Sequence, residues 1–287
     1  MPAARSVSEY FAPYAAVIVT GASSGIGEEF VRAISKLSPR ARFFNLSRTP
    51  PKSPLEAGQI VHCPADLSTA SGQESAALAA QNWLATAGGG GAILLINNSG
   101  FGSFGPFPGP GLDRCLEMID LNARAPMVLT GRLLPLLLER GGAVINVASI
   151  AAFQPTPLMT VYGATKAFLL NWSLGLWQDL RETKVHVLCV CPGPTRTNFF
   201  RGAGFVDAPA TGWLGQTSDA VVQESLRALA SGKALVVTGW LNKLQVALSS
   251  RLPRALVAVL ARRALAKDRP VPHSASAARD IIVTPTK

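Results

Sequence analysis

Residues 15–27 constrain the fold more than any other stretch of the chain, because they join a strand to a helix through a glycine-rich turn. They read Ala-Ala-Val-Ile-Val-Thr-Gly-Ala-Ser-Ser-Gly-Ile-Gly. The run 15–19 is apolar and partly β-branched, which is typical of a strand buried on both faces of a sheet. It ends at Thr20-Gly21, and apolar residues at helical spacing then continue to Ile34. A strand, a glycine turn and a helix in this order form the dinucleotide-binding geometry.

The three glycines of this turn have separate tasks. Gly21 allows the tight turn, Gly25 lets the backbone approach a pyrophosphate, and Gly27 permits close packing of the helix against the strand. Ser23 or Ser24 can cap the helix, whose free N–H groups and dipole favour a bound diphosphate. We therefore predict that a dinucleotide is bound by Gly21, Ser23, Ser24, Gly25, Ile26 and Gly27.

The remaining sequence predicts a single large α/β domain. The chain has 287 residues and no Pro/Ser-rich linker divides it. Strand-like apolar runs alternate with helical stretches, which indicates a doubly wound, Rossmann-like parallel sheet with helices on both faces. The seven candidate strands are residues 15–19, 41–47, 59–63, 91–96, 143–148, 185–190 and 234–238. The predicted divisions are an N-terminal segment (1–13), a nucleotide-binding and catalytic domain (14–240), a basic helical extension (241–267) and a loosely ordered tail (268–287).

Three further residues indicate proton chemistry. Tyr162 and Lys166 lie four residues apart on a predicted helix, so they share one face. A positive charge beside a phenol favours phenolate and lowers the tyrosine pKa. Ser149 follows the strand-like run 143–148, where its hydroxyl can hold a carbonyl oxygen for protonation. Taken alone, the Tyr–Lys pair is more typical of an ordinary helix surface, and the motifs around it decide between the two interpretations.

Seven motifs in a fixed order resemble those of the short-chain dehydrogenase/reductases. They extend over roughly residues 14–240, and Ser99 stands where the family usually has Ala. The motifs are Thr20-Gly21-Ala22-Ser23-Ser24-Gly25-Ile26-Gly27, Asp66-Leu67, Asn97-Asn98-Ser99-Gly100, Asn122, Ser149, Tyr162 with Lys166, and Pro192-Gly193-Pro194-Thr195.

The resemblance implies hydride transfer between a nicotinamide dinucleotide and a carbonyl or alcohol substrate. Tyr162 would be the proton donor, Ser149 would bind the substrate oxygen, and Lys166 would bind the nicotinamide ribose. Asn122 would hold a water for proton relay, or would only shape a helix. Asp66 would meet the adenine amino group, and Asn97 would line the cleft with Gly100. The other implied cofactor residues are Leu67, Asn98, Ser99, Tyr162, Pro192, Gly193, Thr195 and Thr197.

The residues that follow the second strand favour NADP(H) over NAD(H). A site selective for NAD(H) places a carboxylate there to bind the ribose 2′-hydroxyl. This chain has Ser47 and Arg48 instead, with no acid nearby. A guanidinium fits a 2′-phosphate, which a carboxylate would repel. Arg48 as an ordinary loop cation is the alternative.

Aromatic residues around the predicted site favour a bulky or long-chain hydrophobic ketone over a small polar ketone or sugar. Phe199, Phe200, Phe205 and Trp213 fall in the segment that closes over the substrate in the resembled family. Two more aromatic stretches, 101–107 and 153–155, follow predicted strand ends. Ordinary packing of aromatic loops is the alternative interpretation.

Composition limits the other function classes. The formal net charge is +10, but the basic residues are dispersed and form no nucleic-acid recognition module. The four cysteines lack metal-ligand spacing and indicate no disulfide framework, so no metal site is predicted and a reducing cytoplasm is expected. The three histidines are scattered. No uninterrupted apolar stretch is long enough to predict a spanning helix, and no secretory signal precedes the first strand.

The C-terminal extension carries basic residues and no acid between Leu241 and Lys267. Leucines and a valine recur at helical spacings between the basic residues, and Pro253 is expected to divide two helices. Such amphipathic helices can lie on an anionic membrane, cover a substrate mouth or pack on a partner subunit. A peripheral membrane protein is therefore one alternative function. A non-catalytic NADP(H)-binding sensor or scaffold is another, although such chains typically lack the Ser149, Tyr162 or Lys166 equivalents.

The helix that contains Tyr162 predicts an oligomer. It continues as Phe168-Leu169-Leu170-Asn171-Trp172-Ser173-Leu174-Gly175-Leu176-Trp177, which is apolar around more of its circumference than one core face needs. Members of the resembled family usually pair this helix across a two-fold axis. A homodimer or homotetramer is therefore expected.

Overall fold

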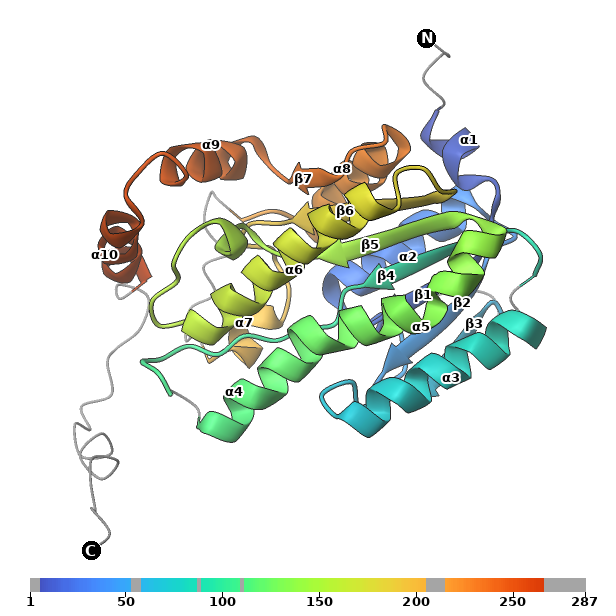
Figure 1. The fold of residues 1–287 in the computed structure, drawn as a ribbon, viewed down its shortest axis with the longest axis horizontal. Coiled ribbons are helices and arrows are strands. Elements are labelled where there is room, and N and C mark those ends of the chain that lie inside the picture. Colours follow the sequence, from blue (N-terminus) through green and yellow to red (C-terminus); the bar gives the residue numbers. More distant parts are fainter. Residues whose placement is uncertain (1–5, 53–57, 87–88, 109–110, 205–214, 266–287) are drawn as a thin grey trace, which may run out of the picture.

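The computed structural model describes residues 6–52, 58–86, 89–108, 111–204 and 215–265, and its centre is one parallel β-sheet (Figure 1). The strand order is β3-β2-β1-β4-β5-β6-β7, with every neighbouring pair parallel. This order confirms the predicted doubly wound sheet, since the chain reverses direction across the sheet after β3. The strands are β1 (Tyr14–Thr20), β2 (Arg42–Ser47), β3 (Ile60–Pro64), β4 (Ala92–Asn97), β5 (Gly142–Val147), β6 (Val185–Cys191) and β7 (Leu235–Val237).

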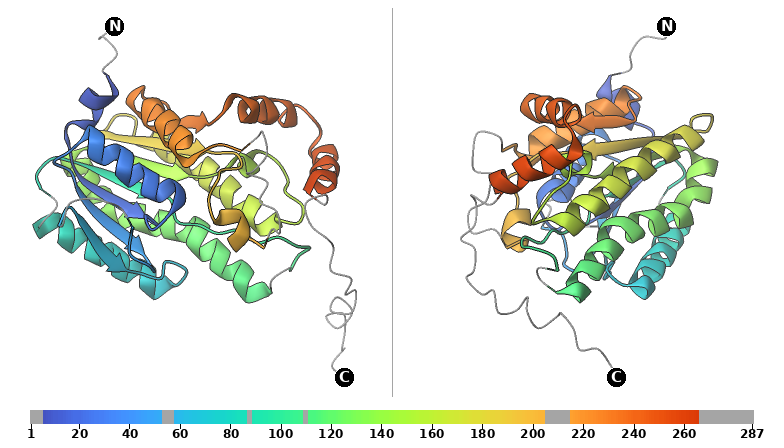
Figure 2. Two further views of the ribbon diagram at one scale, coloured as in Figure 1. Left: turned by 180° about the vertical axis from the view of Figure 1, so that it is seen from behind. Right: turned by 60° about the vertical axis from the view of Figure 1, so that its left-hand side comes forward.

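Helices cover both faces of this sheet. On one face α2 and α8 pack over the central strands, and on the other α3, α5 and α6 lie side by side (Figure 2). Each layer encloses its own apolar cluster. The helices are α1 (Val7–Phe11), α2 (Gly25–Leu37), α3 (Ala70–Thr86), α4 (Leu112–Ile119), α5 (Ala125–Arg140), α6 (Thr160–Asp179), α7 (Phe199–Gly202), α8 (Ser218–Ala230), α9 (Trp240–Ser249) and α10 (Arg254–Leu265), with a π-helical turn η1 (Asp120–Arg124) and a 3-10 turn η2 (Ile150–Phe153).

A chain of polar side chains crosses the middle of the apolar core. Asn97 and Asn146 are register partners at the ends of β4 and β5. The Asn97 Nδ2 donates to Asn146 Oδ1 at 2.8 Å and to Thr130 Oγ1 at 3.1 Å. The Asn146 Nδ2 in turn donates to Ser173 Oγ on α6 at 2.9 Å. The chain therefore ties two strands to the helices that cover them. These bonds satisfy the Nδ2 donors of both asparagines, whose unpaired burial would be costly.

Two helices follow β7, the last strand of the sheet. As the position of Pro253 predicts, α9 ends at Ser249 and α10 begins at Arg254. Within the described residues, no helix is long and apolar enough to cross a membrane. The predicted tail from Asp268 lies outside the described residues, as do Phe205, Trp213 and His273.

Candidate active site

The glycine turn has the geometry that its sequence predicts. Gly21 and Gly25 adopt φ angles of +73° and +64°, which side-chain-bearing residues rarely adopt. A Cβ on Gly27 would overlap the carbonyl oxygen of Gly21 and the side chain of Asn98. Only glycine therefore allows α2 to begin this close to the end of β1.

One detail of the turn differs from expectation. Ser24 occupies the N-cap of α2, but its side chain accepts no hydrogen bond from the helix. The predicted capping bond is therefore not formed, although Ser24 has the extended backbone of an N-cap residue. Those N–H groups lack partners within the helix, so this end of α2 retains the donors that an anion requires.

Hydrogen bonds from two neighbouring strand ends hold the glycine turn. Thr20 Oγ1 accepts bonds from the backbone N–H groups of Asn98 and Ser99, each at 2.9 Å. The Asn98 Nδ2 donates to the carbonyl oxygens of Thr20 at 3.0 Å and Gly21 at 3.1 Å. Asn45 Oδ1 on β2 accepts from the Ala22 N–H at 3.0 Å. Asn98 and Ser99 thus stabilise the turn through hydrogen bonds.

The ends of β2 and β3 place a cation and a carboxylate beside this turn. Ser47 is buried and its Oγ donates to Thr49 O at 2.7 Å, whereas Arg48 is exposed. The pKa of Asp66 is lowered, chiefly by hydrogen bonds from Ser68 and to a smaller extent by the charge of Arg48. Because the Ser47 hydroxyl proton is already engaged, Arg48 is the better candidate to meet a 2′-phosphate.

Two predicted cofactor residues have side chains that belong to the core. Leu67 is buried in the apolar layer under α3 and α5, so it can contribute only backbone atoms to a ligand. Asn97, expected to line the cleft, is instead buried in the polar chain between β4 and β5. Successive residues of a strand point to opposite faces of the sheet. The position of Asn97 in its motif therefore does not reveal which face its side chain takes. Ile26 packs partly against the opposite core layer.

Ser149, Tyr162 and Lys166 come together at the carboxyl end of β5. Ser149 lies two residues after β5 and caps η2, with Ala151 N–H donating to its Oγ at 3.1 Å. Tyr162 and Lys166 lie in the first turns of α6, and all three side chains are buried. The Lys166 Nζ donates to Val147 O at 2.8 Å, which fixes the lysine against the strand.

Burial dominates the protonation of the tyrosine. It raises the pKa of Tyr162 to about 12, and a hydrogen bond with Ser149 offsets this only in part. The expected lowering of that pKa by Lys166 is therefore not what the structure gives. The Lys166 Nζ lies 5.8 Å from the Tyr162 ring centroid, and burial lowers the pKa of Lys166 itself to about 8. Tyr162 is consequently a neutral phenol near pH 7, which can donate a proton.

Asn122 occupies the π-helical turn between α4 and α5. Its Oδ1 accepts from the Phe101 N–H at 3.1 Å, and its Nδ2 donates to Phe101 O at 2.9 Å and Thr165 Oγ1 at 3.1 Å. A Cβ on Gly100 would lie 3.0 Å from Asn122 Oδ1 and 3.4 Å from Lys166 Nζ. Asn122 therefore shapes the helix and the loop, in agreement with its structural interpretation, and it also lies on the Lys166 side of the site.

The loop after β6 closes the site from the other side. Pro192 O accepts from the Ile150 N–H at 3.0 Å, and Thr195 Oγ1 donates to Gly193 O at 3.0 Å. The methyl carbon of Thr197 would lie 3.0 Å from a Cβ on Gly25. This loop thus covers the start of α2, and the four predicted residues Pro192, Gly193, Thr195 and Thr197 connect the glycine turn to Ser149.

An apolar cluster surrounds the Tyr162 ring. Its buried members are Phe104, Met118, Met159, Tyr162 and Ala203, with Phe101, Ala151, Leu158, Val161, Phe199, Phe200 and Leu265 packed against them. The Tyr162 and Phe199 rings lie 5.2 Å apart. Phe153, also expected at the cleft, packs instead against a cluster between α6 and β6 that contains Leu169 and Cys189. A Cβ on Gly102 would lie 2.8 Å from Phe199 Cζ, so this glycine preserves space beside the ring.

Sequence reasoning missed several residues that hold this site. Asn45 braces the glycine turn, Met159 and Gly102 shape the apolar cluster, and Asn242 on α9 abuts Gly193. Asn242 Nδ2 also donates to Thr238 O at 2.8 Å. A polar residue inside an apolar strand run was a usable signal for Asn45. Asn242 offered none, because an asparagine in a basic amphipathic helix is unremarkable by pattern.

Dinucleotide binding fits these residues. The glycine turn leaves room that any Cβ would fill, the start of α2 presents unpaired amide donors, and Arg48 and Asp66 follow the next two strands. No cluster of three or more potential metal-ligating His, Cys, Asp or Glu side chains occurs within the described residues. The four cysteines are free thiols, and Cys189 Sγ lies 3.8 Å from Cys191 Sγ.

The chain is similar to known proteins in both sequence and fold. A family model described as short chain dehydrogenase matches residues 15–204. The ketoacyl reductase HetN of Nostoc sp. (strain PCC 7120 / SAG 25.82 / UTEX 2576) is 32% identical over 183 residues. That match spans 62% of this chain and 62% of HetN.

Solved structures share the fold. A short chain dehydrogenase from Burkholderia cenocepacia J2315 in complex with NADP superposes with a TM-score of 0.70 at 24% identity, covering 86% of this chain and 97% of that one. A short chain dehydrogenase/reductase from Burkholderia phymatum in complex with NAD gives 0.68 at 18% identity, covering 92% and 99%.

Proposed function

The chain belongs to the short-chain dehydrogenase family of oxidoreductases, and we propose that it is an NADP(H)-dependent reductase of hydrophobic ketones, with residues 14–240 as its catalytic domain. The observation that carries this proposal is the buried group of Ser149, Tyr162 and Lys166 beside a glycine turn whose helix end has no side-chain cap and could accept a diphosphate. Such a group supplies the proton and the oxyanion stabilisation that carbonyl reduction needs.

The chain's own residues manage the proton. Bound NADPH supplies the hydride that adds to the carbonyl carbon. The Tyr162 hydroxyl donates its proton to the carbonyl oxygen, and its raised pKa keeps that proton in place until the oxygen becomes basic. The Ser149 hydroxyl bonds the same oxygen. Lys166, mostly protonated below about pH 8, stabilises the phenolate that remains. Asn122 would position a water that returns the proton through Lys166.

The preference for NADP(H) rests on Arg48. Related folds hold either NADP or NAD, so the preference has to come from this chain's own side chains. Arg48 is exposed at the end of β2, where its charge acts on Asp66. No carboxylate occupies the β2 end to select the 2′-hydroxyl. The guanidinium of Arg48 would instead bind a 2′-phosphate through two parallel hydrogen bonds.

The preference for a hydrophobic substrate rests on the apolar cluster around Tyr162. A carbonyl that reaches the Tyr162 hydroxyl must pass side chains such as Phe199 and Met159, which offer no hydrogen bonds. A small sugar would lose its hydration without compensation there. The alcohol oxidation is the same chemistry in reverse, and the neutral Tyr162 carries the proton that the reductive step consumes.

Two further observations support the proposed assembly and location. Phe168 and Trp177 on α6 are exposed, although they are large and apolar. Their exposure supports a homodimer or homotetramer through this helix. The four free thiols support a reducing cytoplasm.

The experiment that tests the proposal is a titration with NADPH and, separately, NADH, followed by nicotinamide fluorescence. We expect much tighter binding of NADPH, and reversal of the preference in Arg48→Asp. Lys36→Asp, an exposed charge reversal in the last turn of α2, is the matched control. A screen of bulky and small ketones for NADPH oxidation then tests the substrate class. Tight binding without turnover of any ketone would favour a sensor, and no binding of either dinucleotide would refute the oxidoreductase function.

A further inference from the structure

The last two described helices concentrate exposed apolar side chains. We call α9, α10 and their connection, residues 240–265, the C-terminal helix pair. This segment holds seven of the 17 exposed large hydrophobic side chains in the described part of the chain. They are Trp240, Leu244, Leu248, Leu252, Leu256, Val259 and Leu260. Trp240 is 71% exposed, far more than an aromatic side chain packed against a core.

These side chains form outward stripes on both helices. On α9, Trp240, Leu244 and Leu248 recur every four residues, so they share one face. On α10, the outward residues Leu256, Val259 and Leu260 lie opposite Val257 and Leu265, which turn towards the protein. Both helices therefore turn these apolar residues away from the body, whereas an ordinary surface helix turns its apolar face towards the core.

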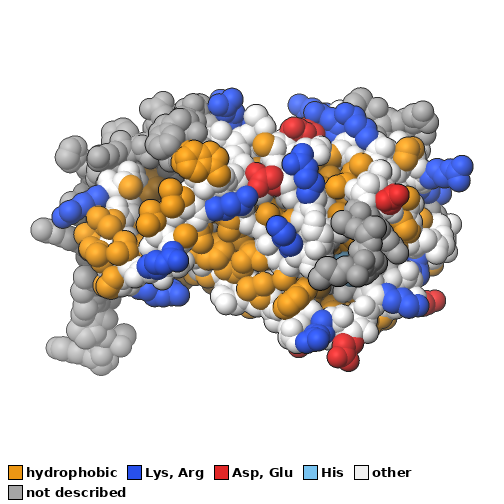
Figure 3. All heavy atoms as spheres, turned by 90° about the horizontal axis from the view of Figure 1, so that it is seen from above, with side chains coloured by type: hydrophobic (Ala, Val, Ile, Leu, Met, Phe, Trp, Pro, Cys, Tyr) orange, Lys and Arg blue, Asp and Glu red, His pale blue; other side chains and the backbone are white. Residues whose placement is uncertain are grey.

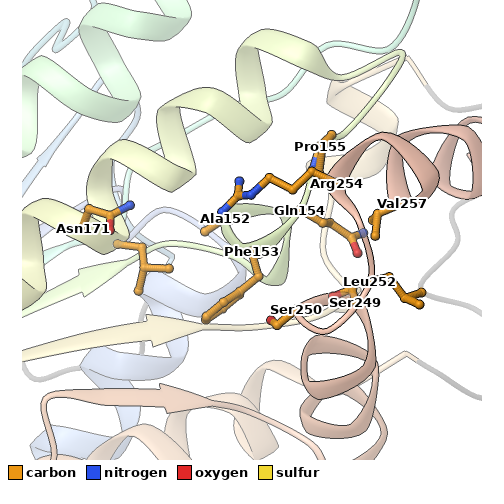
Figure 4. Close-up of a pocket in the computed structure, with 11 residues that line it drawn as sticks. Ala152, Phe153, Gln154, Pro155, Asn171, Ser249, Ser250, Leu252, Arg254 and Val257 are labelled. Carbon is orange, nitrogen blue, oxygen red and sulfur yellow. The ribbon is translucent and has the colours of Figure 1, made fainter.

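The pair touches the body at few buried points. Asn242 is the buried residue of α9 and Val257 that of α10. Between these points a pocket of about 230 Å³ separates the pair from η2 and α6 (Figure 4). Ser249, Ser250 and Arg254 line the pocket on the side of the helix pair. Within the described residues, these inward contacts account for one side of each helix, and the outward stripes have no packing partner.

The charge of the pair is uniform. Lys243, Arg251, Arg254, Arg262 and Arg263 are all exposed, and residues 241–265 contain no acid. Lys243 is paired with Glu224 of α8 at 3.1 Å. Viewed from above, apolar side chains at this end of the molecule share one face with Lys and Arg side chains placed among them (Figure 3).

We propose that the C-terminal helix pair is a docking surface for an anionic lipid bilayer. Outward leucines would enter the acyl boundary, Trp240 would lie at the interface, and the arginines would reach the anionic headgroups. A second copy of the chain fits less well, because a two-fold contact would place this acid-free basic surface against itself. The inward Leu265 packs on the apolar cluster around Tyr162, so a docked molecule would hold its substrate side close to the lipid.

The test uses the full chain, with vesicles of phosphatidylcholine alone or mixed with phosphatidylglycerol. We expect co-sedimentation with the anionic vesicles, weakened by added salt, and a blue shift of the tryptophan fluorescence that is reduced in Trp240→Phe. The triple variant Leu248→Gln, Leu256→Gln, Leu260→Gln should bind at least about tenfold more weakly. Arg262→Gln with Arg263→Gln should also lose on the order of tenfold. These side chains are exposed, so the fold should tolerate the changes.

Two control variants separate this surface from non-specific effects. Leu78→Gln alters an exposed leucine on α3, and Lys36→Gln with Arg40→Gln removes two exposed charges near the end of α2. Both should bind as the wild type does. Absence of wild-type binding, or equal losses in the controls, would overturn the proposal. So would a wild-type dimer that dissociates in the leucine variant without any vesicle binding. The assay needs no turnover, so its failure would leave the proposed reductase untouched.

Discussion

The nucleotide side and the substrate side of the active site hold their shapes by different forces. On the nucleotide side, the glycine turn is fixed by hydrogen bonds from Thr20, Asn45 and Asn98. On the substrate side, the walls are mainly apolar contacts among Phe199, Met159 and their neighbours. Hydrogen bonds are directional and demand specific partners. Apolar contacts depend mostly on volume. The difference indicates that one side is built for a single ligand, while the other can accept a range of related substrates.

Tyr162 is where the two sides meet, so removing its hydroxyl should have the largest effect. Tyr162→Phe leaves the ring packing intact but removes the proton donor, and we expect kcat to fall by about 10³-fold or more. NADPH affinity should change little. The control is Tyr10→Phe on α1, far from the site. This variant loses a hydroxyl that is hydrogen-bonded to His186 Nδ1 of β6 at 2.9 Å. Normal turnover in the Tyr162 variant would assign proton transfer to another group.

A methyl group in the glycine turn tests the rigid side. In Gly27→Ala the new Cβ would overlap Gly21 O and Asn98, so the turn must shift. We expect NADPH affinity to fall by about a hundredfold, since small displacements of positioning groups are costly. Gly131→Ala on α5 meets open space and is the matched control. If isothermal titration gave equal affinities for both variants, the turn would be more adaptable than its hydrogen bonds indicate.

A cavity on the substrate side should have a smaller and more selective effect. Phe199→Ala enlarges the space beside the Tyr162 ring. We expect kcat/KM for small hydrophobic ketones to fall by about tenfold, while bulkier ketones lose less and the NADPH dissociation constant is unchanged. Phe107→Ala, at an exposed position outside the cluster, serves as the control. A parallel loss of NADPH affinity would show that the substrate side and the nucleotide side are coupled and do not act separately.

The buried ammonium between the two sides gives the smallest effect. The pKa of Lys166 is lowered to about 8 in the fold, whereas an unfolded lysine keeps its proton to about pH 10.4. Between these values the unfolded state binds more protons, so stability should rise with pH. Relative to Lys166→Met, the nucleotide-free protein should gain about 1 kcal/mol between about pH 8 and about pH 9. Urea titrations at each pH measure the difference, and a constant difference would contradict the lowered pKa of buried Lys166.

The sequence predicted the sheet well because its signals are local. Each candidate strand is a short apolar run bounded by turn residues, and all seven appear in the structure. The roles of Gly21 and Gly27 in the turn were equally predictable, since only glycine fits their geometry. Tyr162 and Lys166 share a helix face by spacing alone, as expected.

The failures concern properties that depend on distant parts of the chain. The raised pKa of Tyr162 comes from burial by segments far apart in sequence. Asn97 faces the core because of its register with Asn146, which no motif specifies. The outward direction of Leu248 and Leu256 depends on how the helix pair meets the body. A helical spacing predicts which residues share a face, but it does not predict whether that face turns inward or outward.

The polar chain through Asn97, Asn146 and Ser173 has a consequence for how the chain assembles. β4 and β5 are almost uniformly apolar, so hydrophobicity alone hardly distinguishes the native alignment from one slipped along the strands. In the native alignment the two asparagines face each other and their amides are joined. A slipped pairing would bury each amide against hydrocarbon without a partner. The hydrogen-bonded pair therefore favours the native register of β4 and β5 over a slipped one, and with it the positions of the strand ends that carry the site.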